Sequence, residues 1–218
     1  MTETMTGGIP RIGDTAPDFT ATTTDGEITF SQWQDKDKDH WVVLFSHPAD
    51  FTPVCTTELS EFARKASDFA KRNVKLIGVS VDSIHSHLAW VRNMEEIMKV
   101  SIDYPLVADL DMKVAQKYGM IHPGASNTAT VRAVFVIDPK HVIRAMIYYP
   151  MSNGRSVKEI LRLVDSLQLS DAKGIATPVN WEPGESVVIP PAKTCAAVKE
   201  RMKQPYDHKA HYLAFKQP

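Results

Sequence analysis

Hydrophobic runs alternate with helix-like spacings along most of the chain. Residues 41–46 (WVVLFS) and 74–82 (VKLIGVSVD) are short, nearly continuous apolar runs, as in buried strands. Between these runs the apolar residues recur every three or four positions, at Leu59, Phe62, Ala63, Ala66, Phe69 and Ala70. This spacing predicts a helix over about residues 53–72.

The same alternation continues further along the chain. A second helical stripe over 84–98 consists of Ile84, Leu88, Val91, Met94 and Met98. A short strand is predicted at 104–109, a brief helix at 112–119 that ends at Gly119, and two strand-like runs at 131–138 and 141–149 around a turn at Pro139-Lys140. The last clear helix is predicted to begin at Ser156, which has capping-box spacing to Glu159, and to turn inward Val157, Ile160, Leu161, Val164 and Leu167.

This order of elements predicts an α/β fold. We expect a thioredoxin-like mixed sheet flanked by helices on both faces, with an extended N-terminal hairpin that turns at Asp25-Gly26. After about residue 170 the character of the sequence changes, because six of the 14 prolines lie there. We therefore predict a main domain over 1–170 and a Pro-rich C-terminal arm or small domain over 171–218.

Charge and hydropathy narrow the classes of function. The 218 residues carry a net charge of -1, and the pI is about 6.7. These values offer no electrostatic footprint for nucleic acid or for an anionic membrane, so a small or neutral substrate is expected. The N-terminal sequence lacks the features of a secretory signal, and no apolar run is long enough to span a bilayer. We expect a cytoplasmic protein without a membrane span.

The two cysteines limit the redox and metal chemistry. Cys55 and Cys195 are 140 positions apart, which excludes a C-x-x-C pair and a four-cysteine zinc site. In a reducing compartment both are expected to be thiols. His85 and His87 diverge on a helix and are expected to be surface residues, so no metal site is predicted.

The surroundings of Cys55 suggest a reactive thiol. Thr52 followed by Pro53 is a helix-start signal in which the threonine can cap free N–H groups, and it places Cys55 in the first turn of the helix. The helix dipole favours negative charge there, and cysteines in such positions have a lowered pKa. Free cysteines are nonetheless often buried and inert, so the residues alone leave both interpretations open.

The stretch HPADFTPVCTTE resembles the peroxidatic motif of the peroxiredoxins, Pro-x-x-x-Thr-x-x-Cys, with Pro48, Thr52 and Cys55 in the three places. Arg132 begins a strand, as the active-site arginine of that family does. The likeness runs from about residue 11 to 190. The chain is most similar to the 1-Cys, peroxiredoxin-6-like group, because His47 precedes the motif proline and the Val-Cys-Pro tripeptides of the two-cysteine group do not occur.

The resemblance implies a thiol peroxidase that uses no metal or prosthetic group. Cys55 would reduce hydrogen peroxide and organic hydroperoxides and become a sulfenic acid, with Thr52, Arg132 and backbone N–H groups stabilising the departing oxygen. Pro48 would shield the thiolate. His47 is expected to orient groups near Cys55, with a satisfied core histidine as the alternative.

The resemblance also implies supporting residues and partners. Glu58 resembles the glutamate that links two arginines, and Arg155 matches the second arginine. On composition alone the structural explanations would be preferred, with Arg132 as a strand-end charge, Glu58 as a solvated helix residue and Arg155 as a loop residue. A homodimer is expected, with decamers as the larger assembly, and the external reductant is glutathione, thioredoxin or ascorbate.

Several alternatives compete with this interpretation. Cys195 either resolves the Cys55 sulfenic acid or is a spare thiol, and we favour the spare thiol. Phospholipase activity is not expected, because the matching segment lacks a Gly-x-Ser-x-Gly element. A holdase chaperone on the same scaffold remains the main alternative. A thiol-disulfide oxidoreductase is disfavoured by the missing C-x-x-C.

Overall fold

The computed structural model describes residues 9–35 and 39–218. The chain forms two compact units, one ending at Val157 and the other running from Lys158 to Pro218. This division places nearly all of the last long helix in the second unit. The domain boundary proposed at residue 170 lies within that helix and stays a prediction.

The first unit is built on a seven-stranded mixed sheet in the order β2-β1-β5-β4-β3-β6-β7. The strands are β1 (Thr20–Thr23), β2 (Gly26–Thr29), β3 (Trp41–Ser46), β4 (Val74–Ser80), β5 (Leu106–Ala108), β6 (Arg132–Ile137) and β7 (Ile143–Tyr149). β3, β4 and β5 are mutually parallel, whereas β6 runs antiparallel to both β3 and β7. The mixed sheet of a thioredoxin-like fold is thus confirmed.

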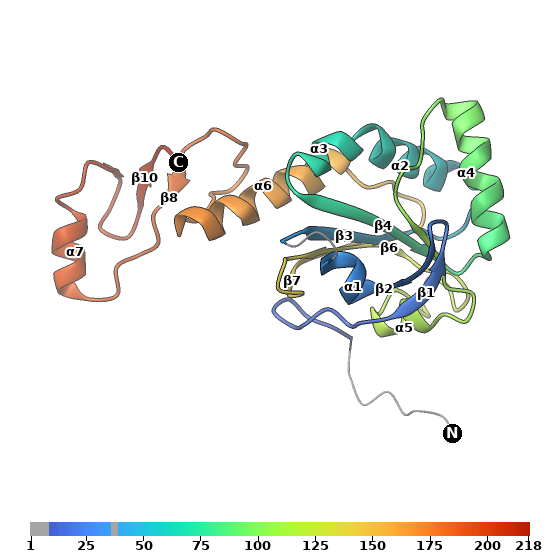
Figure 1. Cartoon of the computed structure of the whole chain (residues 1–218). Coiled ribbons are helices and arrows are strands. Elements are labelled where there is room, and N and C mark those ends of the chain that lie inside the picture. The colour runs from blue at the N-terminus through green and yellow to red at the C-terminus, as the bar shows by residue number, and fades with distance from the viewer. Residues whose placement is uncertain (1–8, 36–38) are drawn as a thin grey trace, which may run out of the picture. The chain divides into compact units, whose positions relative to one another are not determined.

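Helices cover both faces of this sheet. They are α1 (Phe30–Asp35), α2 (Pro53–Arg64), α3 (Ala66–Ala70), α4 (Ile84–Met98) and α5 (Lys113–Lys117). Figure 1 shows α2, α3 and α4 on one face and α1 and α5 on the other. β3 lies between these layers, and all six of its residues are buried, as a central strand requires.

Two predicted helices differ in detail from the structure. The single helix expected over 53–72 is two helices, because Lys65 takes a non-helical conformation (φ -97°, ψ 2°) between α2 and α3. The break lets Phe69 join Phe62 in the buried layer, with ring centroids 6.0 Å apart, while Ala70 stays exposed. In α4 the predicted inward residue Leu88 is 49% exposed, and the buried residues are His87, Trp90 and Met94.

The N-terminal strands form the edge of the sheet. β1 and β2 make an antiparallel hairpin with Thr20 opposite Thr29 and Thr23 opposite Gly26. Gly26 has φ +99°, a backbone conformation that residues with a Cβ atom rarely adopt, so glycine is suited to this turn.

The second unit has a small core of its own. It contains α6 (Val157–Lys173, which begins in the first unit), β8 (Val187–Val188), α7 (Cys195–Arg201), β9 (Asp207–His208) and β10 (Ala214–Lys216). The strands form a three-stranded sheet in the order β8-β10-β9. Ile175, Trp181 and Val187 are buried together, which gives this Pro-rich segment a folded centre. Among the described residues, no helix is long and apolar enough to cross a membrane.

Candidate active site

Cys55 lies where the buried strand β3 passes into helix α2. β3 ends at Ser46, and residues 47–52 form a loop that leads to Pro53, the first residue of α2. Cys55 is therefore in the first turn of the helix, where backbone N–H groups have no partner within the helix. Its side chain is fully buried. The predicted position in the first turn is confirmed.

Thr52 occupies the N-cap position of α2 but does not cap the helix with its side chain. Its hydroxyl instead donates a hydrogen bond to the carbonyl of Ala49, at 2.8 Å. The expected side-chain cap is wrong, because the hydroxyl turns back into the loop. The contact closes the last turn of the loop before Cys55.

Arg132 approaches Cys55 from strand β6. Its Nη1 lies 3.4 Å from the Cys55 sulfur and 2.6 Å from Glu58 Oε2. Nε and Nη2 both donate to the carbonyl of Met151, at 3.0 and 2.6 Å. The guanidinium is thus fixed by partners on two sides while one of its nitrogens contacts the sulfur.

Glu58 joins Arg132 to Arg155. Glu58 Oε1 accepts from the backbone N–H and the Nε of Arg155, at 2.7 and 2.8 Å, and Oε2 accepts from Arg155 Nη2 at 2.8 Å. Burial opposes ionisation of Glu58, but the bonds from Arg155 and the charge of Arg132 outweigh it and lower the pKa of the carboxyl. Two arginines and one glutamate leave a net positive charge in the network that contacts the sulfur through Arg132.

His47 is fully buried in the same loop, and its ring contacts residues that the sequence did not indicate. Its Nε2 lies 2.9 Å from Asp50 Oδ1, and Asp50 Oδ2 lies 2.8 Å from His87 Nδ1. The surface position predicted for His87 is wrong, since its side chain is fully buried. His87 lies two helical turns before Met94, a spacing that indicates the same buried face of α4. The predicted apolar stripe did not include His87. His85 is exposed, as predicted.

The remaining predicted residues are Pro48 and Cys195. Pro48 is buried in the loop next to His47. Cys195 is exposed and begins α7 in the second unit. Both cysteines are free thiols.

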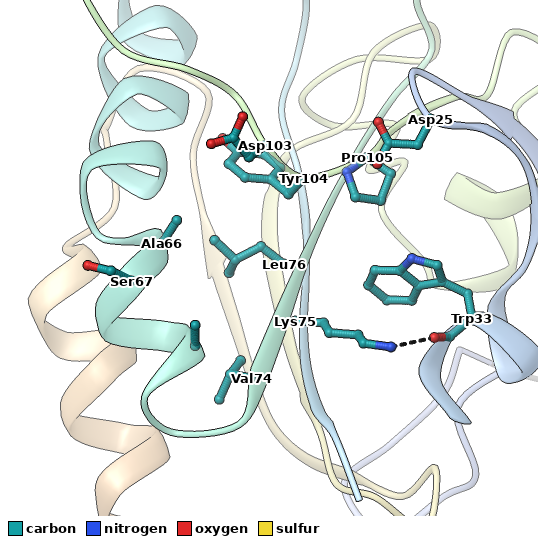
Figure 2. A pocket seen from close by; sticks show the side chains of 11 residues that line it. Asp25, Trp33, Ala66, Ser67, Val74, Lys75, Leu76, Asp103, Tyr104 and Pro105 are labelled. Carbon is teal, nitrogen blue, oxygen red and sulfur yellow. Dashed lines mark hydrogen bonds between the residues drawn. The ribbon is translucent and has the colours of Figure 1, made fainter. Parts of the chain in front are cut away.

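A separate pocket of about 510 Å³ lies on the first unit, and no residue of the Cys55 network lines it. Figure 2 shows its walls, formed by α3, β4, Trp33 and the segment Asp103–Pro105. The Lys75 ammonium in this pocket donates to the carbonyl of Trp33 at 2.7 Å. The pocket therefore has no evident part in the chemistry at Cys55.

Comparison with known proteins identifies the family. Residues 12–146 match the model of the AhpC/TSA family. The chain belongs to the peroxiredoxin family. Residues 166–204 also match the model of the C-terminal domain of 1-Cys peroxiredoxin, which covers much of the second unit.

Individual peroxiredoxins resemble the chain over nearly its whole length. A peroxiredoxin of Aquifex aeolicus (strain VF5) is 50% identical, covering 95% of this chain and 97% of the relative. The solved structure of yeast mitochondrial 1-Cys peroxiredoxin is 43% identical with a TM-score of 0.85, covering 96% of this chain and all of that one. A cysteine-to-serine mutant of the peroxiredoxin 6 of Arenicola marina has a TM-score of 0.83 at 37% identity and covers 97% and 99% of the two chains. The chain is thus a thiol peroxidase of the 1-Cys type.

Proposed function

We propose that Cys55 is the thiol that reduces the peroxide. The observation that carries this proposal is the 3.4 Å contact between its sulfur and Arg132 Nη1 in the first turn of α2. The Cys55 thiolate would attack one peroxide oxygen as the O–O bond breaks. The products are a cysteine sulfenic acid and an alkoxide or hydroxide, which takes up a proton to become alcohol or water.

The proposed roles of the neighbours follow from their contacts. Arg132 and the free N–H groups of the first turn donate hydrogen bonds to the oxygen on which charge develops. Thr52 can donate as well only if its hydroxyl leaves the carbonyl of Ala49. Glu58 and Arg155 hold Arg132 in place, and Pro48 keeps bulk water from the sulfur.

We infer that hydrogen peroxide and organic hydroperoxides are the substrates and that an external reductant restores the thiol. A thiol reductant would condense with the sulfenic acid and release water, and a second thiol would then release Cys55. The yeast mitochondrial 1-Cys peroxiredoxin resolves its thiol through glutathione and thioredoxin systems, which supports a thiol over ascorbate here. We propose a homodimer in the cytoplasm, with the C-terminal segment in the dimer contact and Cys195 as a spare thiol.

The proposal is tested by steady-state peroxide consumption with glutathione, thioredoxin or ascorbate as the only reductant. Turnover with a thiol reductant should be lost in Cys55→Ser and kept in Cys195→Ser. Loss of turnover in Cys195→Ser would instead make Cys195 the resolving thiol. Equal turnover in wild type and Cys55→Ser would remove Cys55 from the reaction, and no turnover in the wild type with any of the three reductants would favour the holdase chaperone.

A further inference from the structure

Three side chains form a buried group: His47 and Asp50 from the loop that leads to Cys55, and His87 from α4. His47 and His87 are fully buried and Asp50 is 7% exposed. The two histidines bind opposite oxygens of the carboxylate, His47 through Nε2 and His87 through Nδ1. We call this set the His47–Asp50–His87 group.

The partners of His87 determine where its protons are. Its Nε2 lies 3.1 Å from the carbonyl oxygen of Val107, and its Nδ1 lies 2.8 Å from Asp50 Oδ2. A backbone carbonyl only accepts hydrogen bonds, and so does an ionised carboxylate. Both ring nitrogens of His87 must therefore carry hydrogen, which makes the ring an imidazolium paired with the Asp50 carboxylate.

The charges around His87 agree with this geometry. Burial alone would lower the pKa of His87, but the bond to Asp50 and the charges of Asp50 and Asp82 raise it. Burial likewise opposes ionisation of Asp50, yet the bonds from His47 and His87 lower the pKa of that carboxyl. Asp82 is held close by, because its Oδ2 accepts from the Asp50 backbone N–H at 3.1 Å.

His47 is left in one defined tautomer. Its Nε2–H donates to Asp50 Oδ1, and burial lowers the pKa of the ring, so the ring is neutral. Nδ1 then keeps its lone pair, and this buried atom has no hydrogen-bond partner among the described residues. Without the Asp50 carboxylate the ring would be free to take the other tautomer.

The same group is tied to the Cys55 network through the backbone. The carbonyl of His47 accepts from the hydroxyl of Thr130 at 2.7 Å, two residues before Arg132. At the end of the loop nearer to Cys55, Asp50 and Phe51 form a turn, and Thr52 then leads into α2. Movement of this loop would therefore change the position of Cys55 relative to Arg132.

We propose that Asp50 and His87 are positioning residues for the peroxidase reaction. The His87 imidazolium holds the Asp50 carboxylate, which fixes the tautomer of His47 and anchors the loop that leads to Cys55. The role in the reaction rests on the proposed function. The protonation of the group does not, so the two can fail separately.

A metal ion is the rival explanation, because ligand atoms of the three side chains lie within 4.8 Å of one another. The geometry favours hydrogen bonds. The two histidine nitrogens lie 2.8 and 2.9 Å from different oxygens of one carboxylate, and one ion would have to lie between all of them. Zinc bound at about 2.0–2.2 Å to each ligand in a tetrahedron holds them roughly 3.3 Å apart.

The first test is a two-dimensional 15N NMR spectrum of the histidine rings in the reduced full-length protein, with metal content measured in the same sample. We expect the two ring nitrogens of His87 to keep imidazolium shifts above pH 6.5. We also expect His47 to show the neutral Nε2–H tautomer. A neutral His87 at pH 7, or one equivalent of zinc that is lost in Asp50→Asn, would overturn the proposal.

The second test is the rate at which hydrogen peroxide oxidises Cys55 in Asp50→Asn and His87→Gln between pH 5.5 and 8.5. An asparagine offers its oxygen to one histidine and its N–H2 group to the other, so either the His47 tautomer or the charge of His87 should change. Misplacement of the loop should slow oxidation by about tenfold or more. His85→Gln, an exposed neighbour on the same helix, should match wild type.

The outcomes are distinguishable. If Asp50→Asn changes the His47 tautomer or the charge of His87 but its Cys55 is oxidised within twofold of the wild-type rate, the positioning role is wrong. If wild-type Cys55 does not react with peroxide, the proposed function fails while the NMR result stands. The wild-type spectrum decides the protonation of the group even where a variant does not fold.

Discussion

At the scale of single residues, the active site depends on charges that are buried together. Glu58 is 3% exposed and bonds to both Arg132 and Arg155, which are also buried. Removing one partner from such a cluster leaves an uncompensated charge in the interior, which is more costly than loss of an exposed ion pair. The arrangement therefore ties the position of Arg132, and its contact with Cys55, to the stability of the fold.

We predict that Glu58→Gln destabilises the protein by about 3 kcal/mol at pH 7 and slows oxidation of Cys55. The pKa of Glu58 is lowered in the folded state. Its stabilising contribution is thus present above the unfolded pKa of about 4.5 and is lost as the pH falls through the folded value. Urea unfolding of both proteins between pH 3 and 7 should show their difference shrinking toward low pH.

The control for this prediction is Glu61→Gln on the same helix. Glu61 is half exposed, and its Oε2 lies 3.7 Å from Arg64 Nη1. Loss of this ion pair should change the free energy of unfolding by less than about 0.5 kcal/mol. A difference between Glu58→Gln and wild type that stays constant down to pH 3 would show that the carboxylate charge is not the cause.

The sequence was informative for residues whose role depends on local position. Cys55, Thr52 and Pro53 could be placed from a helix-start pattern, and the structure puts them at the start of α2. It was not informative where contacts come from distant elements. His87 and Asp50 are 37 positions apart in the sequence, and only the packing of α4 brings their side chains together. Packing also determines that the Thr52 hydroxyl donates to the carbonyl of Ala49 and does not cap α2.

At the scale of elements, helix α2 is held on the sheet by an aromatic contact. The rings of Phe62 in α2 and Phe45 in β3 are stacked with centroids 4.1 Å apart. The guanidinium of Arg155 lies 5.5 Å from the ring of Phe45 and 5.8 Å from that of Phe62. The two stacked rings therefore contact both α2, which carries Cys55, and Arg155, which bonds to Glu58.

We predict that Phe62→Ala destabilises the protein by about 3–5 kcal/mol, because the cavity it leaves is flanked by Phe45 and Arg155. Phe51→Ala is the matched control, since Phe51 is 56% exposed and should cost less than about 1 kcal/mol. Denaturant unfolding measures both. Equal effects of the two substitutions would contradict the role of the aromatic contact.

Periodicity predicted most elements of the first unit because each buries an apolar face. It did not predict the interruption at Lys65, since the sequence there continues in good helix formers and the break serves the packing of Phe69. In α4, periodicity predicted that Leu88 is buried and did not predict the burial of Trp90. Both side chains are apolar, so which of them is buried depends on how the helix packs on the sheet.

At the scale of the whole molecule, the second unit is a folded segment despite its prolines. Trp181 is buried, and its indole N–H donates to the carbonyl of Glu185 at 3.1 Å. Composition indicated a change of character after residue 170 but could not distinguish an arm from a domain. The strands of the three-stranded sheet are two or three residues long, which is too short to give a periodic signal.

We predict that the full-length protein sediments with about twice the 24.3 kDa mass of one chain at micromolar concentration. The proposed dimer contact includes the C-terminal segment, so a chain that ends at residue 170 should sediment with the mass of a monomer. Sedimentation velocity over a dilution series measures both. A full-length monomer, or an unchanged dimer after truncation, would contradict the proposed contact.

The central claim is that Cys55 reacts with peroxide far faster than an ordinary thiol, and stopped-flow tryptophan fluorescence tests it most directly. Trp90 is a suitable reporter, because its ring lies 5.2 Å from that of His47 and 6.3 Å from that of Phe51 in the loop before Cys55. Reduced protein mixed with hydrogen peroxide should give a fast signal that Cys55→Ser lacks and Cys195→Ser keeps. Intact mass should show a single oxygen added at Cys55. Oxidation of Cys55 no faster than that of a free thiol would contradict the account.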